Sequence, residues 1–333
     1  MEPKESRTSG LEHQEFRPSG LEPIAISGPQ YPIAEAKGIV FEGGGVLGIG
    51  HVGALDELNK TRPLAGFTHF AGSSAGAIIA MALACGATVD YIKGMLETTN
   101  FTEFNDSSWL CVQNIARALK VYGWYKGQTL EDWLGSNLKT LTGDSEITLA
   151  QHYKKFGTYL LVTMTLVEYP DCKTVYADYI THPNLPVKVA VRRSISIPGY
   201  FASMPAKPEY GDPKGIVYVD GGLLDNYPIE QLYSKLPKEQ VIGIKLISKV
   251  KIHHSAKCDS RPVSGPVEFA EVIITSLRNQ ALQLHIEPDD WARTIKVDVG
   301  TISAFNFNLT EKEKTYLFSQ GQKAAGQYLS GTT

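Results

Sequence analysis

Residues 38–60 read GIVFEGGGVLGIGHVGALDELNK, and this stretch decides the fold. Its first part, residues 38–42, is apolar enough to form a short buried strand. A glycine-rich loop follows, and residues 48–60 carry their apolar side chains at helical spacing. A strand, a tight loop and a helix in this order are typical of a parallel sheet with crossover helices.

The same alternation of strand and helix continues along the chain. We expect further strands at residues 67–72, 158–167, 174–179, 215–219, 241–247 and 294–299. We expect further helices at residues 75–85, 187–197, 267–287 and 310–329, and a mainly helical region at 90–156. The chain is therefore predicted to have an α/β fold.

The composition is that of a globular protein with a core, since 43% of the residues are apolar and 20% are charged. Lys and Arg number 32 against 35 Asp and Glu, so no global positive field favours nucleic acid as a partner. The cysteines lie far apart, without the C-x-x-C pairs of metal or redox sites, which predicts free thiols in a reducing compartment. They are Cys85, Cys111, Cys172 and Cys258.

Changes in composition divide the chain into three segments. Residues 1–34 are polar, which predicts a flexible tail or, alternatively, an address for a partner. Residues 35–250 hold the alternating pattern, and residues 251–333 are expected to form a C-terminal extension of helices and a strand packed on the same domain. The sequence shows neither a Sec-type signal peptide nor an apolar stretch long enough to span a bilayer. We therefore expect a cytoplasmic protein that can lie on a membrane without crossing it.

The loop after the first strand, Gly43-Gly44-Gly45-Val46-Leu47-Gly48, is a G-x-G-x-x-G sequence. A dinucleotide-binding loop of this type is followed about 20 residues later by an acidic residue. Residues 60–74 contain neither Asp nor Glu, which disfavours a nucleotide. Alternatively, unpaired N–H groups of the loop stabilise an oxyanion formed during acyl transfer, or the glycines merely allow a tight turn.

A second motif, Gly72-Ser73-Ser74-Ala75-Gly76, lies between the strand expected at 67–72 and the helix expected at 75–85. This G-x-S-x-G context is that of a nucleophile elbow, in which a sharp turn exposes the serine Oγ. Ser74 has glycine two residues before and two residues after it, whereas Ser73 does not and is assigned a structural role.

The two motifs are separated by one strand–helix–strand unit. A right-handed crossover makes its two strands parallel and places their carboxyl ends at one edge of the sheet. The glycine loop and Ser74 are therefore expected to face the same cleft, as a nucleophile beside an oxyanion hole.

A serine hydroxyl also needs a base to accept its proton. Asp220, in Tyr218-Val219-Asp220-Gly221-Gly222, ends a β-rich run and is the candidate, with a simple turn or capping role as the alternative. Asp225 is the competing carboxylate, and we interpret it as a helix cap.

A Ser–His–Asp triad is a further alternative, because Ser74, Asp220 and His285 occur in the chain order of α/β-hydrolases. His285 falls inside the long amphipathic helix expected at its position, so we interpret it as a helix-surface residue. His51 and His69 have no carboxylate beside them and are assigned structural roles.

The ordered motifs 43–48, 72–76 and 220–222 make the sequence resemble the patatin-like phospholipases. The serine-rich segment 191–201, which ends in Ile-Pro-Gly-Tyr-Phe, and Asn226-Tyr227-Pro228 fit the same family. The resemblance covers residues 36 to 248 and implies a three-layer α-β-α sandwich with a mostly parallel central sheet. It further implies a Ser–Asp dyad that hydrolyses acyl lipids through an acyl-enzyme without a histidine.

The expected site can be written out by role. It comprises the nucleophile Ser74, the base Asp220, an oxyanion hole at Gly43, Gly44, Gly45, Val46 and Gly48, the elbow glycines Gly72 and Gly76, and the turn glycines Gly221 and Gly222. Neither His253-His254 nor Asp289-Asp290 has partners at metal-ligand spacing, so we expect no metal and no cofactor.

The expected function is that of a lipid acyl hydrolase of the phospholipase A or lysophospholipase type, acting on phospholipid or another acyl lipid. A soluble esterase or thioesterase with the same dyad, and an inactive lipid-binding scaffold, are the alternatives. The helical residues 90–135, with Phe101, Phe104, Trp109 and Trp124, form an acyl-pocket wall, a membrane-facing cap or plain core. Peripheral membrane contact is thus a hypothesis, and the sequence does not indicate whether a protein activator is needed.

The chain departs from the family at Leu47, where Arg or Lys is usual. Backbone N–H groups hold the oxyanion, so the hole is expected to survive the change. The departure leaves open a preference for an acyl ester other than phospholipid.

Overall fold

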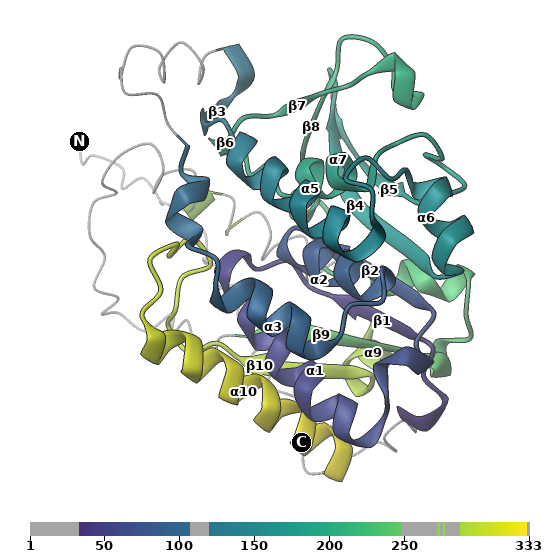
Figure 1. Cartoon of the computed structure of the whole chain (residues 1–333), viewed down its shortest axis with the longest axis vertical. Helices are drawn as coiled ribbons and strands as arrows, with labels where there is room; N and C mark the ends of the chain where they lie inside the picture. Colours follow the sequence, from purple (N-terminus) through teal and green to yellow (C-terminus); the bar gives the residue numbers. More distant parts are fainter. Residues whose placement is uncertain (1–32, 107–119, 248–271, 274–275, 277–286, 332–333) are drawn as a thin grey trace, which may run out of the picture.

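The computed structural model describes residues 33–106, 120–247, 272–273, 276 and 287–331. Most of the tail predicted at 1–34 and most of the helix expected at 267–287 lie outside this description. Figure 1 shows the described part as a central sheet with helices packed along it.

The main sheet of the described chain has eight strands in the order β10-β9-β1-β2-β4-β8-β7, with β5 paired to β4. They are β1 (Gly38–Phe41), β2 (His69–Ser73), β4 (Tyr159–Val167), β5 (Cys172–Ala177), β7 (Met204–Pro205), β8 (Val217–Asp220), β9 (Val241–Ile247) and β10 (Thr294–Asp298). The neighbours β10, β9, β1, β2 and β4 run parallel, whereas β5, β8 and β7 are joined by antiparallel pairings. The predicted sheet of mostly parallel strands is confirmed.

Helices flank this sheet at the positions that the apolar spacing indicates. The α-helices are α1 (Ile49–Thr61), α2 (Ala75–Ala84), α3 (Val89–Glu97), α5 (Gln128–Thr142), α6 (Leu149–Phe156), α7 (Val187–Ser194), α9 (Pro288–Ala292) and α10 (Glu311–Ser330). The 3₁₀ helices are η1 (Ile33–Glu35), η2 (Gly45–Gly48), η3 (Leu64–Gly66), η4 (Phe101–Phe104), η5 (Pro208–Tyr210), η6 (Gly221–Leu223), η7 (Ile229–Ser234) and η8 (Lys238–Gln240).

Two local expectations differ from the structure. The mainly helical region at 90–156 also contains the strand β3 (Gly123–Tyr125), which pairs in parallel with β6 (Gly199–Phe201). This pairing depends on a neighbouring strand far along the chain, which local apolar spacing does not reveal. The helix expected at 187–197 ends earlier, at Ser194, in keeping with the bias against helical backbone that Pro198 imposes on the residue before it.

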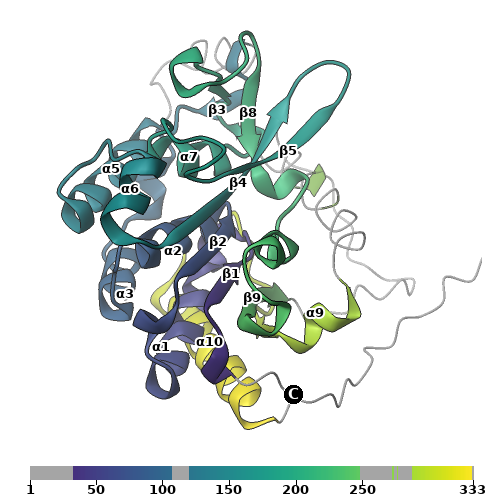
Figure 2. The same ribbon diagram turned by 90° about the vertical axis from the view of Figure 1, so that its right-hand side faces the viewer.

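Alternate residues of β1 point to opposite faces of the sheet. Ile39 and Phe41 belong to the larger core cluster, to which α1, α2 and α3 contribute. Val40 packs on the other face with Ile229 and Leu232 of η7. Figure 2 shows α1, α2 and α3 on one side of β1 and β2, and α9 on the other. The predicted α-β-α sandwich is therefore confirmed.

The C-terminal part of the chain is built into this sandwich. Strand β10 extends the sheet beside β9, and α10 packs along α1. The two helices approach closely, because a Cβ added at Gly53 would overlap the carbonyl oxygen of Phe318 and one at Gly321 would overlap that of Gly50. Among the described helices, none combines the length and apolar character required to cross a bilayer.

His51 in α1 is fully buried beneath the first loop. Its Nε2–H donates to the carbonyl oxygen of Glu42 at 2.8 Å, and its ring meets that of Phe41 edge-on at 5.6 Å. Burial lowers the pKa of His51 to about 4. The imidazole is therefore neutral near pH 7 and has a structural role, as expected from the sequence.

This pKa makes stability depend on pH. Between pH 6.5 and about 4 the unfolded chain binds a proton at His51 that the folded chain does not bind. The contribution of neutral His51 to the free energy of unfolding is therefore complete above pH 6.5 and is lost as the pH falls towards 4. Urea unfolding of the wild type and His51→Gln at pH 7.5 and 4.5 measures it. We expect the wild type to lose about 2–3 kcal/mol more than the variant between these pH values; equal losses would contradict the assignment.

Candidate active site

The side chains of Ser74 and Asp220 lie together although 146 residues separate them in the chain. Ser74 Oγ donates a hydrogen bond to Asp220 Oδ2 at 2.7 Å. Both residues are buried, with exposed fractions of 1% and 0%. A hydroxyl and a carboxylate at this distance can exchange a proton directly.

Strand pairing explains this contact. Strands β2 and β5 both pair with Val162 and Thr163 of β4, so they lie on opposite edges of that strand. Strands β5 and β8 both pair with residues 164–167, so these two also lie on opposite edges. It follows that β2 and β8 share one edge of β4.

On that shared edge the two strands run towards each other. Ser73, the last residue of β2, is paired with Thr163, and Asp220, the last residue of β8, is paired with Met164. Their carboxyl ends therefore meet at adjacent positions of β4. The residue that follows β2 is Ser74, which places its hydroxyl beside the carboxylate that ends β8.

The turn at Ser74 is sharp and has an unusual backbone conformation. Ser74 has φ 51° and ψ −125°, a conformation that L-residues rarely adopt and that the surrounding structure must maintain. A Cβ at Gly76 would overlap the carbonyl oxygen of Phe41, and one at Gly72 would overlap the backbone of Gly76. Glycine at these positions lets α2 begin directly against the strands.

The serine-rich segment around α7 supports both members of the pair. The hydroxyl of Ser194 accepts the N–H of Ser74 at 2.8 Å, and the carbonyl oxygen of Ser196 accepts the N–H of Asp220 at 2.9 Å. Buried Arg192 donates to Ser196 Oγ at 2.7 Å and to the carbonyl oxygen of Gly127 at 2.9 Å. Burial lowers the pKa of Arg192 to about 10, so it stays charged at neutral pH.

The turn after Asp220 orients the carboxylate. Asp220 Oδ1 accepts the N–H of Gly222 at 2.7 Å, while Oδ2 receives the hydroxyl of Ser74. Asp225 instead accepts the N–H of Tyr227 at 3.1 Å and the hydroxyl of Tyr176 at 2.8 Å. Asp225 thus closes a turn, and the helix cap expected from the sequence is wrong, because the helix that follows, η7, has Pro228 as its N-cap.

The glycine loop is held on both sides by segments distant in the sequence. Gly43 donates its N–H to the carbonyl oxygen of Asn226 at 3.0 Å, and Asn226 Nδ2 donates to the carbonyl oxygen of Gly43 at 2.8 Å. Val46 donates its N–H to the carbonyl oxygen of Ala304 at 3.1 Å. The N–H groups of Gly44 and Gly45 have no hydrogen-bond acceptor among the described residues.

The residue before the loop takes part in a buried ion pair. Glu42 pairs with Lys245 of β9, and its Oε2 accepts the N–H of Leu246 at 2.7 Å. The side chains of Glu42 and Lys245 are 4% and 6% exposed. The pair ties the end of β1 to β9 where the glycine loop begins; the sequence analysis missed it because the two residues are 203 positions apart.

A small apolar cavity of about 50 Å³ opens at Ser74. Gly45 and Val46 line it on the loop side. Phe101 and Phe104, for which an acyl-pocket wall, a membrane-facing cap and plain core were the alternatives, lie on it together with Phe201 and Phe307 and also belong to the buried core. Phe307 precedes α10, so the C-terminal segment contributes to this wall, which the sequence analysis did not foresee. Leu47 does not line this cavity; it is buried and belongs to the larger core cluster.

Several candidates from the sequence lie outside the described residues, namely His285, His253, His254, Trp109, Cys111 and Cys258. Cys85 and Cys172 are free thiols. Within the part of the chain that the structure describes, no group of three or more His, Cys, Asp or Glu side chains is arranged to hold a metal ion.

Comparison with known proteins identifies the family of the chain. Residues 39–233 match the family model of the patatin-like phospholipases. The chain belongs to this family. The family resemblance predicted from the three motifs is thereby confirmed.

Among individual relatives, this patatin-like chain is similar to the uncharacterized protein YqhO of Bacillus subtilis strain 168, with 29% identity over 303 residues that cover 88% of this chain and 98% of YqhO. It is 26% identical over 268 residues to triacylglycerol lipase 5 of Saccharomyces cerevisiae, covering 74% of this chain and 34% of the lipase. The family match and the yeast lipase support a lipid hydrolase.

A solved structure shares the fold. The crystal structure of VipD from Legionella pneumophila superposes with a TM-score of 0.59 at 18% identity, covering 89% of this chain and 67% of VipD. The fold shared with VipD therefore extends beyond the residues matched by the family model.

The ion pair beside the glycine loop yields a prediction for stability. In Lys245→Met the carboxylate of Glu42 is left buried without its cation, which costs about 3–5 kcal/mol of unfolding free energy. Urea unfolding measures the loss. Lys60→Met, which removes an exposed lysine paired with Asp56 and Glu57, is the control and should change stability far less. Similar losses in the two variants would argue against a structural role for the buried pair.

Proposed function

We propose that this protein is a lipid acyl hydrolase of the phospholipase A or lysophospholipase type in which Ser74 is the nucleophile and Asp220 the base. The observation that carries the proposal is the 2.7 Å hydrogen bond between Ser74 Oγ and Asp220 Oδ2. Membership of the patatin-like phospholipase family supports the reaction class. The family's lipases support an acyl lipid as the substrate.

In the proposed acylation, Ser74 Oγ attacks the ester carbonyl carbon while its proton passes to Asp220 Oδ2. Collapse of the tetrahedral intermediate breaks the bond to the alcohol oxygen, which takes the proton from Asp220. In deacylation, water gives a proton to Asp220 and attacks the acyl carbon. The fatty acid leaves as the proton returns to Ser74 Oγ, so both residues end in their starting state.

The negative charge of the tetrahedral intermediate needs hydrogen-bond donors beside Ser74. The N–H groups of Gly44 and Gly45 suit this role, because no described residue accepts them. Gly43 and Val46 donate theirs to Asn226 and Ala304, so we assign these two residues to holding the loop. The N-terminus of α2 at Ser74 adds a favourable dipole. Each lost donor is expected to cost about 10²–10³ in turnover.

The pair predicts which substitutions remove activity. Ser74→Ala should lower kcat/KM for a monomeric fatty acyl ester by about 10⁴-fold or more, and Asp220→Asn should come close to that. Ser73→Ala is the matched control, since Ser73 is the equally buried neighbour whose Oγ has no hydrogen-bond partner among the described residues. A fluorophosphonate probe should label the wild type and Ser73→Ala but not Ser74→Ala. Labelling of Ser74→Ala at the wild-type rate would reject Ser74 as the nucleophile.

Lipid as the substrate class is tested separately. Phospholipid vesicles and monomeric short-chain esters are compared at equal ester concentration, with products identified by mass spectrometry. We expect release of fatty acid from the vesicles that is absent in Ser74→Ala. Turnover of monomeric esters alone would identify a soluble esterase, and no turnover of either substrate together with no more fluorophosphonate labelling than in Ser74→Ala would favour a lipid-binding scaffold.

A further inference from the structure

The cavity at Ser74 shares a wall with a second, larger cavity. Phe101 and Phe307 line both of them. The second cavity measures about 260 Å³ and lies between the end of α3 and residues 307–309. Phe101 and Phe307 therefore lie between the cavity at Ser74 and a larger space.

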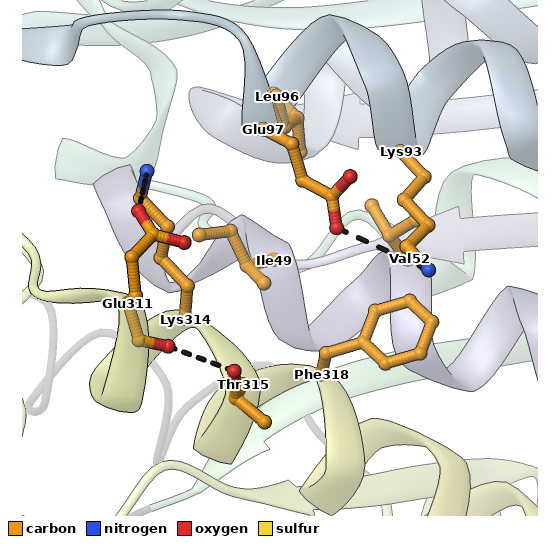
Figure 3. A pocket seen from close by; sticks show the side chains of 9 residues that line it. All are labelled: Ile49, Val52, Lys93, Leu96, Glu97, Glu311, Lys314, Thr315 and Phe318. Atoms are coloured by element: carbon orange, nitrogen blue, oxygen red, sulfur yellow. Dashed lines mark hydrogen bonds and ion pairs between the residues drawn. The ribbon is translucent and has the colours of Figure 1, made fainter.

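A third cavity continues the second. Glu97 and Lys314 line both, and the third cavity, of about 170 Å³, runs on between α1, α3 and α10. Figure 3 shows it, with Val52 on α1 facing Phe318 on α10 below Lys93 and Glu97 of α3. We call the second and third cavities together the outer groove.

We propose that the outer groove holds the fatty acyl chain of the substrate, which extends from Ser74 past Phe101 and Phe307 to the space between α1, α3 and α10. The inference rests on the proposed function and deepens it, since it makes long-chain acyl esters the preferred substrates.

The size of the cavity at Ser74 supports this path. At about 50 Å³ it is far smaller than the ~300–1,000 Å³ of typical ligand pockets. A short acyl group needs little more room than this cavity provides. A long chain must leave it, and Phe101 and Phe307 are the residues that line both this cavity and the outer groove.

The chemistry of the groove changes along its length: the second cavity is lined mostly by polar side chains, including Thr98, Asn100 and Asn308, whereas the third cavity is more apolar. Its inner lining includes the apolar side chains of Ile49, Val52 and Phe318. The charges at its rim are already paired, Lys93 with Glu97 at 3.9 Å and Lys314 with Glu311 at 2.9 Å. These paired charges cancel, so the rim attracts neither an anion nor a cation, whereas the inner lining gains from burying methylene groups.

The wall at Phe307 is held by ring contacts that a chain could replace. Phe307 stacks on Tyr200 with ring centroids 5.2 Å apart and is only partly buried. Phe101 meets Phe104 edge-on at 6.0 Å. An acyl chain that displaced Phe307 would still contact Tyr200 and Phe104, so opening the wall exchanges one apolar contact for another.

The proposal is tested with a substitution that narrows the far end of the groove. Thr315 is exposed on α10 and lines the groove, so Thr315→Trp adds a large ring there without disturbing the core. Ser319→Trp, one turn later on the same helix, is exposed outside the groove and is the matched control. The readout is the ratio of kcat/KM for p-nitrophenyl palmitate to that for p-nitrophenyl butyrate. We expect Thr315→Trp to lower this ratio at least about tenfold and Ser319→Trp to leave it unchanged.

A ratio that stays at the wild-type value in Thr315→Trp, or that falls equally in Ser319→Trp, would overturn the proposal. Binding of a fluorescent long-chain fatty acid to the Ser74→Ala background provides a readout that does not need hydrolysis. Excluding two or more methylene groups should weaken this binding at least about tenfold in Thr315→Trp. If the wild type hydrolyses neither ester, the proposed function fails, while the binding measurement still decides the groove.

Discussion

The site depends on one feature of strand pairing, the meeting of β2 and β8 on a single edge of β4. Both strands end there, at positions paired with Thr163 and Met164, and the hydrogen bond between Ser74 and Asp220 follows from that register. A shift of β8 by one residue would turn Asp220 to the other face of the sheet. The antiparallel part of the sheet is therefore what brings the carboxylate of Asp220 to the hydroxyl of Ser74, because parallel strands alone would not have their carboxyl ends face each other.

Around this pair, strained and close-packed backbone is maintained by contacts from distant segments. The positive φ of Ser74 is accompanied by a hydrogen bond from its N–H to Ser194, and the glycine loop is held by Asn226 on one side and Ala304 on the other. Ala304 and Phe307 lie beyond residues 39–233, the range of the family match. The C-terminal segment thus completes both the loop and the cavity, which explains why β10 and α10 are integral to the same sandwich.

Much of the local structure could be predicted from residue patterns. The strands β1, β2, β4 and β9 and the helices α1, α2 and α10 lie within about two residues of their expected bounds, because their apolar periodicity is strong and glycines mark the turns. Strand β3 was missed because its partner β6 is far away in the sequence. The Glu42–Lys245 pair and the support from Arg192 were missed for the same reason: a buried charge reveals its partner only when the chain is folded.

The sequence by itself determined the family, the alternation of strand and helix, and the types of residue available for chemistry, because glycine spacing and apolar periodicity depend on neighbours along the chain. Only the tertiary structure decided which loop N–H groups have no acceptor among the described residues, which carboxylate reaches Ser74, and how the cavity at Ser74 adjoins the outer groove. These properties depend on distances between segments that are far apart in the sequence, and such distances are set by strand register and helix packing rather than by any local pattern.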